Sequence, residues 1–167
     1  MLSRVGPRPL FWLMALACAA ALAAALVSQH VYGMQPCPWC VLQRLIVALI
    51  GLSCVAGAVL APRRLARGWA LPPFALAIAG AAAALWQHFV AAASASCDLT
   101  LADKLMSAIA LDLAWPEVFA PFASCADAKV NLFGVPYEFW SLALFAALAV
   151  LALAIWRQLG ADSPSKG

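Results

Sequence analysis

Four long apolar runs, separated by shorter polar stretches, dominate the pattern of hydrophobic and polar residues along the chain. The runs cover residues 10–29, 41–61, 70–91 and 139–157. About 20 apolar residues in a helix cross the roughly 30 Å hydrocarbon core of a bilayer. We therefore predict an all-α integral membrane protein, in which residues 1–167 form one membrane domain built as a bundle of four transmembrane helices.

Composition supports the membrane interpretation. The chain is 66% hydrophobic and only 10% charged, whereas soluble domains average about 45–50% apolar and about 25% charged residues. The basic residues flank the apolar runs and form no polar face, which argues against a soluble nucleic-acid-binding protein. The first run also resembles a signal peptide, but it is longer than a typical signal core and three more runs follow it, so we interpret it as a helix.

The distribution of charge predicts the topology. If the four helices alternate in direction, one side of the membrane receives most of the basic residues: Arg4, Arg8, Arg63, Arg64, Arg67, Arg157 and Lys166. The other side receives Asp98, Asp103, Asp112, Glu117 and Asp127, against only Lys104 and Lys129. The positive-inside rule then places both termini in the cytoplasm and the loops 30–40 and 94–136 on the opposite side.

The long loop 94–136 is not plainly hydrophilic. Large apolar residues punctuate it, and Pro116 and Pro121 interrupt any long helix. We expect this segment to lie on the membrane surface, partly as a short amphipathic helix. A loop that packs over the helical bundle is the alternative, and either arrangement keeps Cys125 close to Cys37.

A Cys-x-x-Cys pair, Cys37 and Cys40, marks the outer start of the second apolar run. Pro38 suits the first helical turn, where its missing N–H costs nothing. Cys40 then lies at the positive end of the helix, where a thiolate is favoured. Arg44 follows one turn later on the same face and adds a positive charge near that sulfur. The pattern predicts a dithiol whose inner sulfur works as a thiolate at the membrane surface.

The chain has six cysteines. Cys97 and Cys125 lie in the long outer loop, on the side that permits disulfides if it is a bacterial periplasm. They form either a static disulfide, stabilising by roughly 3–4 kcal/mol, or a second dithiol pair that exchanges with Cys37 and Cys40. Exchange is the more economical interpretation, and a four-cysteine zinc site is a further alternative. Cys18 and Cys54 lie inside apolar runs, where we expect inert, buried thiols.

Two further polar residues lie near the outer ends of the helices. His88, beside Gln87, could hydrogen-bond a carbonyl of a bound molecule or could satisfy a neighbouring helix. Glu138, at the start of the fourth run, suits the positive end of a helix dipole, and we assign it no chemistry.

These features together resemble the disulfide bond formation protein B (DsbB) family. The resemblance rests on four helices, on Cys37-Pro38-Trp39-Cys40 with Gln43-Arg44 on the second, and on the loop pair Cys97 and Cys125. Local likenesses include Trp86-Gln87-His88 and Trp115-Pro116-Glu117-Val118-Phe119. The order of the motifs differs from that of vitamin K epoxide reductase-like proteins, in which the loop pair precedes the Cys-x-x-Cys.

The resemblance implies a thiol oxidase of the bacterial inner membrane that passes electrons from a periplasmic DsbA-type dithiol protein to membrane quinone. The acceptor would be ubiquinone in preference to menaquinone, with no metal. The resemblance also implies redox-active disulfides Cys37–Cys40 and Cys97–Cys125. The partner would attack Cys97, and Cys125 would exchange with Cys37. Cys40 would then donate to a quinone held with Arg44 and His88.

Two alternative functions stay open. One is a DsbI-like paralogue, which has the same fold but serves one dedicated partner. The other is a non-catalytic four-helix membrane protein whose disulfides are static.

Overall fold

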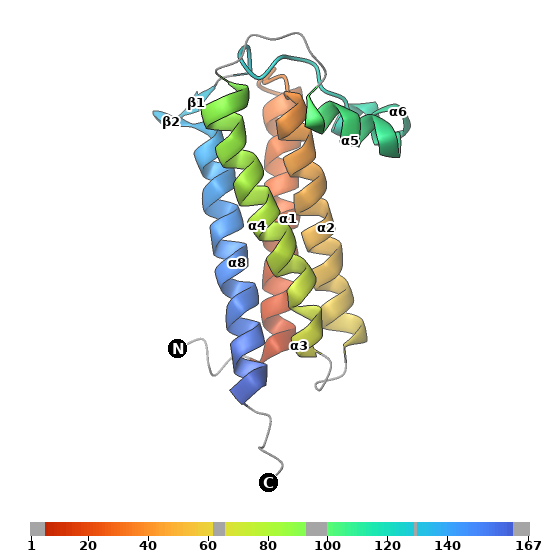
Figure 1. Cartoon of the computed structure of the whole chain (residues 1–167), viewed down its shortest axis with the longest axis vertical. Coiled ribbons are helices and arrows are strands. Elements are labelled where there is room, and N and C mark those ends of the chain that lie inside the picture. The colour runs from red at the N-terminus through yellow and green to blue at the C-terminus, as the bar shows by residue number, and fades with distance from the viewer. Residues whose placement is uncertain (1–5, 62–65, 93–99, 129, 162–167) are drawn as a thin grey trace.

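Four long helices lie side by side in a bundle (Figure 1), and the computed structural model describes residues 6–61, 66–92, 100–128 and 130–161. The first two are α1 (Pro7–His30) and α2 (Pro38–Leu60). The third span joins α3 (Ala66–Trp69), α4 (Leu71–Trp86) and a π-helical turn, η2 (Gln87–Ala91). The fourth is α8 (Tyr137–Ala161). All four spans are long and apolar enough to cross a membrane, which confirms the predicted fold class.

The core of the bundle forms where α1 packs along α2 and α4 packs along α8. Its fully buried side chains include Phe11 and Met14 of α1, Ile50 of α2 and Phe145 of α8. Gly80 of α4 permits the close approach of α8, because a Cβ atom at this position would overlap the ring of Phe145. This packing holds Phe145 in place, and Phe145 also lines the cavity described below.

The third span differs from the uniform helix expected over residues 70–91. It begins at Ala66, is interrupted at Ala70, and ends in the π-helical turn η2. A π-helical turn inserts one extra residue and so rotates the side chains that follow it relative to an α-helix. The hydrophobic pattern does not signal this insertion, because apolar residues continue on both sides of Gln87 and His88.

The segment between the third and fourth spans contains three short helices. They are α5 (Leu101–Ile109), α6 (Leu111–Ala114) and α7 (Pro116–Phe119). Thr100 and Asp103 form a capping box that begins α5. Ala102 and Met106 of α5 are buried, whereas Leu105 is exposed. Figure 1 shows α5 and α6 projecting sideways at one end of the bundle, so a short helix is present where one was expected. Its location on a membrane surface stays a prediction.

A small antiparallel hairpin leads into α8 and was not predicted. Strands β1 (Asn131–Leu132) and β2 (Val135–Pro136) pair across a turn formed by Phe133 and Gly134. Both turn residues have positive φ, 54° and 79°, as a tight hairpin turn requires. The indole N–H of Trp140 donates to the carbonyl of Leu132 at 3.4 Å and fastens the hairpin to α8.

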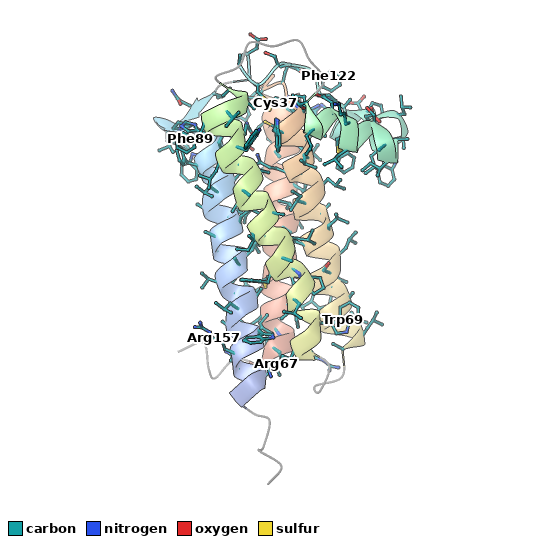
Figure 2. The ribbon with its side chains drawn as sticks, in the orientation of Figure 1. Cys37, Arg67, Trp69, Phe89, Phe122 and Arg157 are labelled. Carbon is teal, nitrogen blue, oxygen red and sulfur yellow. The ribbon has the colours of Figure 1, made fainter. Side chains whose placement is uncertain are left out.

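The two ends of the bundle differ in character (Figure 2). Arg67, Trp69 and Arg157 lie at one end, and Cys37 and Phe122 lie at the other. The guanidinium of Arg67 stacks over the ring of Trp156 at 4.2 Å. The end that carries Arg67 is the one predicted to face the cytoplasm.

Candidate functional site

The start of α2 positions the Cys-x-x-Cys pair. Pro38 is the first helical residue, and Cys37 is the N-cap, whose sulfur accepts a hydrogen bond from the backbone N–H of Cys40 at 3.4 Å. The Sγ atoms of Cys37 and Cys40 lie 2.8 Å apart. Cys37 is fully buried, and Cys40 is partly buried. The two thiols therefore form one contact pair at the outer mouth of the bundle.

The outer segment brings Cys125 to the same place. The backbone N–H groups of Phe122 and Ala123 both donate to the carbonyl of Pro36, at 2.9 and 3.3 Å. Cys125 then lies in hydrogen-bond contact with the Cys37 thiol, and the backbone N–H of Trp39 also donates to its sulfur. Cys37 thus lies between Cys40 on one side and Cys125 on the other.

The pKa values of Cys37 and Cys125 are shifted in opposite directions. The hydrogen bond from Cys37 lowers the pKa of Cys125 below the usual thiol range, and the N–H of Trp39 acts in the same direction. The contacts with Cys125 and Cys40, together with burial, raise the pKa of Cys37. The contact therefore favours a thiolate at Cys125 over a thiolate at Cys37, so Cys125 is the better nucleophile of the two.

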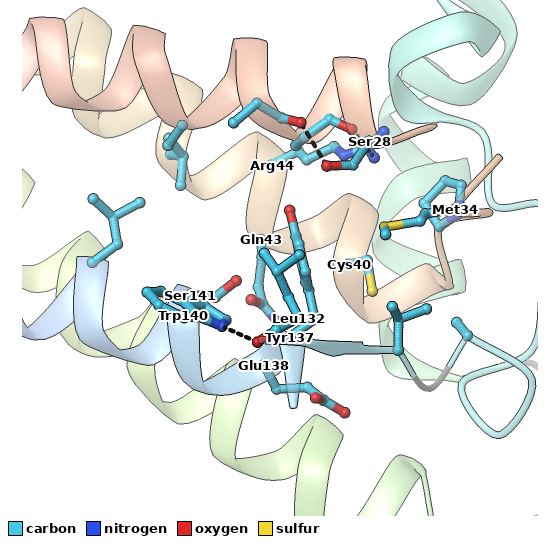
Figure 3. A pocket seen from close by; sticks show the side chains of 18 of the residues that line it. Ser28, Met34, Cys40, Gln43, Arg44, Leu132, Tyr137, Glu138, Trp140 and Ser141 are labelled. Carbon is cyan, nitrogen blue, oxygen red and sulfur yellow. Dashed lines mark hydrogen bonds between the residues drawn. The ribbon is translucent and has the colours of Figure 1, made fainter. Parts of the chain in front are cut away.

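A cavity of about 340 Å³ opens beside Cys40 (Figure 3). Cys40, Gln43 and Arg44 of α2 form its polar wall. The apolar walls come from α1 and α8, through Ala21, Leu22, Ala25, Leu144 and Phe145. Tyr137 lines its outer end, where the phenol hydrogen-bonds Ser28 of α1. The cavity therefore joins a thiol and a cation at one end to a hydrocarbon-like surface at the other.

Arg44 is buried and hydrogen-bonded, and it does not extend to solvent. One guanidinium nitrogen, Nη1, donates to Gln29 Oε1 at 2.5 Å and to the carbonyl of Val118 at 3.1 Å. The other, Nη2, donates to the carbonyl of Ala25 at 3.3 Å. Arg44 thus connects α1, α2 and the segment that carries Cys125, a structural role that the sequence did not reveal.

Two glutamines complete the surroundings of Cys40. Gln87 Nε2 donates to Cys40 Sγ at 3.2 Å, and Gln43 Nε2 donates to Gln87 Oε1 at 2.6 Å. Both side chains are buried. The sequence places Gln87 beside His88 and gives no indication of a contact for Gln43. A polar residue inside an apolar run was the one available signal.

His88 lies apart from the cavity wall. Its Nδ1 atom is 4.0 Å from Glu138 Oε1, and its ring packs against Phe89 and Phe139. Glu138 is buried and lines the cavity. The hypothesis that His88 binds a cofactor stays a prediction.

Two of the remaining cysteines lie in the core of the bundle. Cys18 and Cys54 are buried among the core residues of α1 and α2, in keeping with inert thiols. Cys97 lies outside the described residues. The five described cysteines are free thiols, so the disulfides Cys37–Cys40 and Cys97–Cys125 stay predictions. Within the described ranges, no group of three or more His, Cys, Asp or Glu side chains could hold a metal ion.

Comparisons with known proteins cover nearly the whole chain. The family described as disulfide bond formation protein DsbB matches residues 7–155. Disulfide bond formation protein B 1 of Pseudomonas aeruginosa is 37% identical over 145 residues, covering 84% of this chain and 89% of that protein. Disulfide bond formation protein B of Verminephrobacter eiseniae is 38% identical over 156 residues, covering 89% and 85%. That of Nitrosomonas europaea is 28% identical over 159 residues, covering 93% and 97%.

Proposed function

Because this chain belongs to the DsbB family of membrane disulfide bond formation proteins, we propose that it oxidises a soluble DsbA-type dithiol protein and passes the electrons to membrane quinone. Family membership supports a disulfide-forming redox role for a multi-pass membrane protein. The observation that carries the finer proposal is the position of Cys37, in contact with both Cys40 and Cys125.

The first half of the reaction takes place in the outer segment. A thiolate of the partner attacks Cys97 of the Cys97–Cys125 disulfide, forms a mixed disulfide and expels Cys125 as a thiolate. The second partner thiol then attacks the mixed disulfide, which releases the oxidised partner and reduced Cys97. The partner loses two electrons and two protons, and the loop pair gains the electrons.

The second half moves these electrons to the bundle. The Cys125 thiolate attacks Cys37 of the Cys37–Cys40 disulfide, forms a Cys37–Cys125 bond and expels Cys40 as a thiolate. Attack of Cys97 on Cys125 then restores the loop disulfide and leaves Cys37 and Cys40 reduced. The contact of Cys125 with Cys37, and the backbone N–H of Trp39 that donates to the Cys125 sulfur, support this direction of attack.

The cavity beside Cys40 has the properties that a quinone site needs. Its volume of about 340 Å³ lies in the range of about 300–1,000 Å³ that small-molecule sites occupy. Arg44 offers a cationic donor for a ring oxygen, and the apolar residues of α1 and α8 suit an isoprenoid tail. A bound quinone would accept two electrons and two protons and leave as the quinol, while Cys37 and Cys40 return to the disulfide.

The proposed orientation follows from charge. The end of the bundle with Arg67 and Arg157 faces the cytoplasm, and the end with Cys37 and Cys125 faces the periplasm. The membrane is then the bacterial inner membrane. There, exposed Leu101, Leu105 and Ile109 of α5 could rest on the lipid surface.

The test is quinone reduction by the purified protein given a reduced DsbA-type partner. We expect one quinone reduced for each partner disulfide formed, and no turnover when Cys40 is replaced by Ser. Cysteines that stay in disulfides and do not react, whether or not quinone is present, would favour the static four-helix alternative. Turnover with a single co-purifying partner, and with no other dithiol protein, would identify the dedicated paralogue.

A further inference from the structure

We propose that Gln87 is a catalytic residue whose amide N–H stabilises the Cys40 thiolate, and that Gln43 is the positioning residue that holds this amide in the donating orientation. The proposal rests on the proposed function, because a stabilised thiolate matters only if Cys40 is released as one. It assigns a role to two buried polar side chains that the exchange steps above do not use.

The two hydrogen bonds run in one direction, from Gln43 to Gln87 and from Gln87 to Cys40. Gln43 Nε2 donates to Gln87 Oε1 at 2.6 Å, so the carbonyl oxygen of Gln87 is already occupied by a donor. The amide nitrogen of Gln87 must then point the other way, and it meets Cys40 Sγ at 3.2 Å. If the Gln87 amide turned over, it would oppose two N–H donors and present an oxygen to the sulfur. Gln43 therefore selects the orientation in which Gln87 donates.

Both glutamine side chains are buried, which increases the energetic importance of their hydrogen bonds. Gln87 is 4% exposed and Gln43 is 5% exposed, so water cannot replace a lost hydrogen bond at either side chain. A thiolate accepts a hydrogen bond much more strongly than a neutral thiol, because the acceptor is charged. The Gln87 amide therefore favours the charged form of Cys40 over the neutral form, without adding a second cation to the membrane.

The backbone at Gln87 is consistent with a functional placement. Gln87 is the first residue of the π-helical turn η2, which follows α4 directly. The turn lets Gln87 face α2 while His88, the next residue, faces Glu138 of α8. Single π-helical turns of this kind occur frequently at functional sites.

The experiment measures Cys40 itself, in reduced protein without quinone or partner. The rate of Cys40 alkylation by iodoacetamide is measured by peptide mass spectrometry at about pH 7 and at about pH 9.5. The ratio of the rate at about pH 7 to the rate at about pH 9.5 reports the thiolate fraction at the lower pH. In Gln87→Met, which has a similar volume and no donor, we expect this ratio to fall about tenfold. The comparison is made in the Cys37→Ala background, in which Cys40 and Cys125 no longer share a thiol. There Cys125 serves as the internal control, and its ratio should change less than about twofold.

A double-mutant cycle tests Gln43. If Gln43 acts only by orienting Gln87, Gln43→Met lowers the ratio in the wild-type background and adds nothing in the Gln87→Met background. A merely structural role predicts instead that the two losses add. Gln87→Leu also lacks a donor, so it replaces Gln87→Met if that variant does not fold, with the same expected fall.

An unchanged Cys40 ratio in the folded Gln87 variant would overturn the proposal, as would an equal fall at Cys125. Because quinone and partner are absent, the result is independent of whether the protein reduces quinone. A positive result without quinone turnover would refute the proposed function and leave the Gln87–Cys40 interaction standing.

Discussion

The backbone carbonyl of Pro36 accepts a hydrogen bond from the backbone N–H of Phe122 at 2.9 Å. Pro36 precedes the Cys-x-x-Cys, and Phe122 precedes Cys125, so this main-chain pairing fixes the loop sulfur next to the bundle sulfur. Arg44 reinforces it from below, through its hydrogen bond to the carbonyl of Val118 at 3.1 Å. The contact between Cys125 and Cys37 therefore depends on backbone geometry as well as on the cysteines themselves.

Replacing Cys125 by Ser should trap a covalent complex between Cys97 and a soluble periplasmic protein. Without Cys125, Cys97 forms the mixed disulfide by attacking the disulfide of the oxidised partner, which expels one partner thiolate, and no second loop thiol is left to displace the partner from Cys97. A non-reducing gel of cells that express the variant should show a band of higher mass that disappears with reductant. Its absence would count against Cys97 as the sulfur that meets the partner.

Cys18 and Cys54 provide the controls for that experiment. Both are buried in the core between α1 and α2. Cys18→Ala and Cys54→Ala, made in the Cys125→Ser background, should leave the trapped band unchanged. In the otherwise wild-type protein they should leave turnover unchanged.

Replacing Arg44 by Ala should weaken both quinone use and the fold. The substitution removes the cation from the cavity wall, and it also leaves three protein acceptors without their donor, which adds a structural cost. We expect the apparent KM for quinone to rise about tenfold and the Tm to fall by about 5 °C or more. Arg44→Lys should recover only part of each loss, because Lys lacks the planar fork of donors.

Gln29→Met separates the two roles of Arg44. It removes one of the two acceptors of Nη1 but leaves the guanidinium at the cavity wall. The Tm should fall while the quinone KM changes little. If Arg44→Ala lowered the Tm and left the quinone KM at the wild-type value, Arg44 would be excluded from the quinone site.

The reactivity of Cys125 should persist to lower pH than that of an ordinary thiol. Its pKa is lowered by the hydrogen bond from Cys37, so its thiolate is present above that lowered pKa and is lost as the pH falls through it. The midpoint of its alkylation rate against pH should lie below about 8.5, the value of a free thiol. Cys37→Ala removes the donor and should move the midpoint upward. An unchanged midpoint would show that Cys37 does not tune Cys125.

Replacing Gly80 by Ala should destabilise the bundle and distort the cavity. The added Cβ would overlap the ring of Phe145, which lines the cavity. Overpacking of this kind costs about 1–3 kcal/mol. Gly68→Ala is the matched control, since a Cβ at Gly68 has no neighbour within 4 Å. Thermal unfolding should show a lower Tm for Gly80→Ala alone, and Phe145→Leu in the same chain should restore part of it.

The parts of the fold that depend on local pattern could be predicted from the sequence. Long apolar runs give the spans, and helical spacing places Arg44 one turn beyond Cys40. The proximity of Cys125 to Cys37 was expected from the short reach of a surface segment and from the family resemblance. The backbone hydrogen bond from Phe122 to Pro36 that creates this proximity could not be predicted, because it does not depend on the identity of the side chains.

Other features escaped prediction for equally physical reasons. The orientation of Gln87 depends on the π-helical turn η2, which the hydrophobic pattern of the third span does not reveal. The hairpin turn at Phe133 and Gly134 uses a positive φ at a bulky residue, which turn statistics disfavour. The structural role of Arg44 depends on carbonyl groups of Ala25 and Val118, and every residue carries such a group.

The central claim is that Cys40 is the sulfur that faces quinone. The most direct measurement is the visible absorbance of the reduced, purified protein after quinone is added at neutral pH. A thiolate in contact with quinone should give a charge-transfer band that Cys37→Ser retains and Cys40→Ser loses. Loss of the band in Cys37→Ser, with retention in Cys40→Ser, would contradict the account. It would make Cys37 the quinone-facing sulfur and reverse the electron path through the motif.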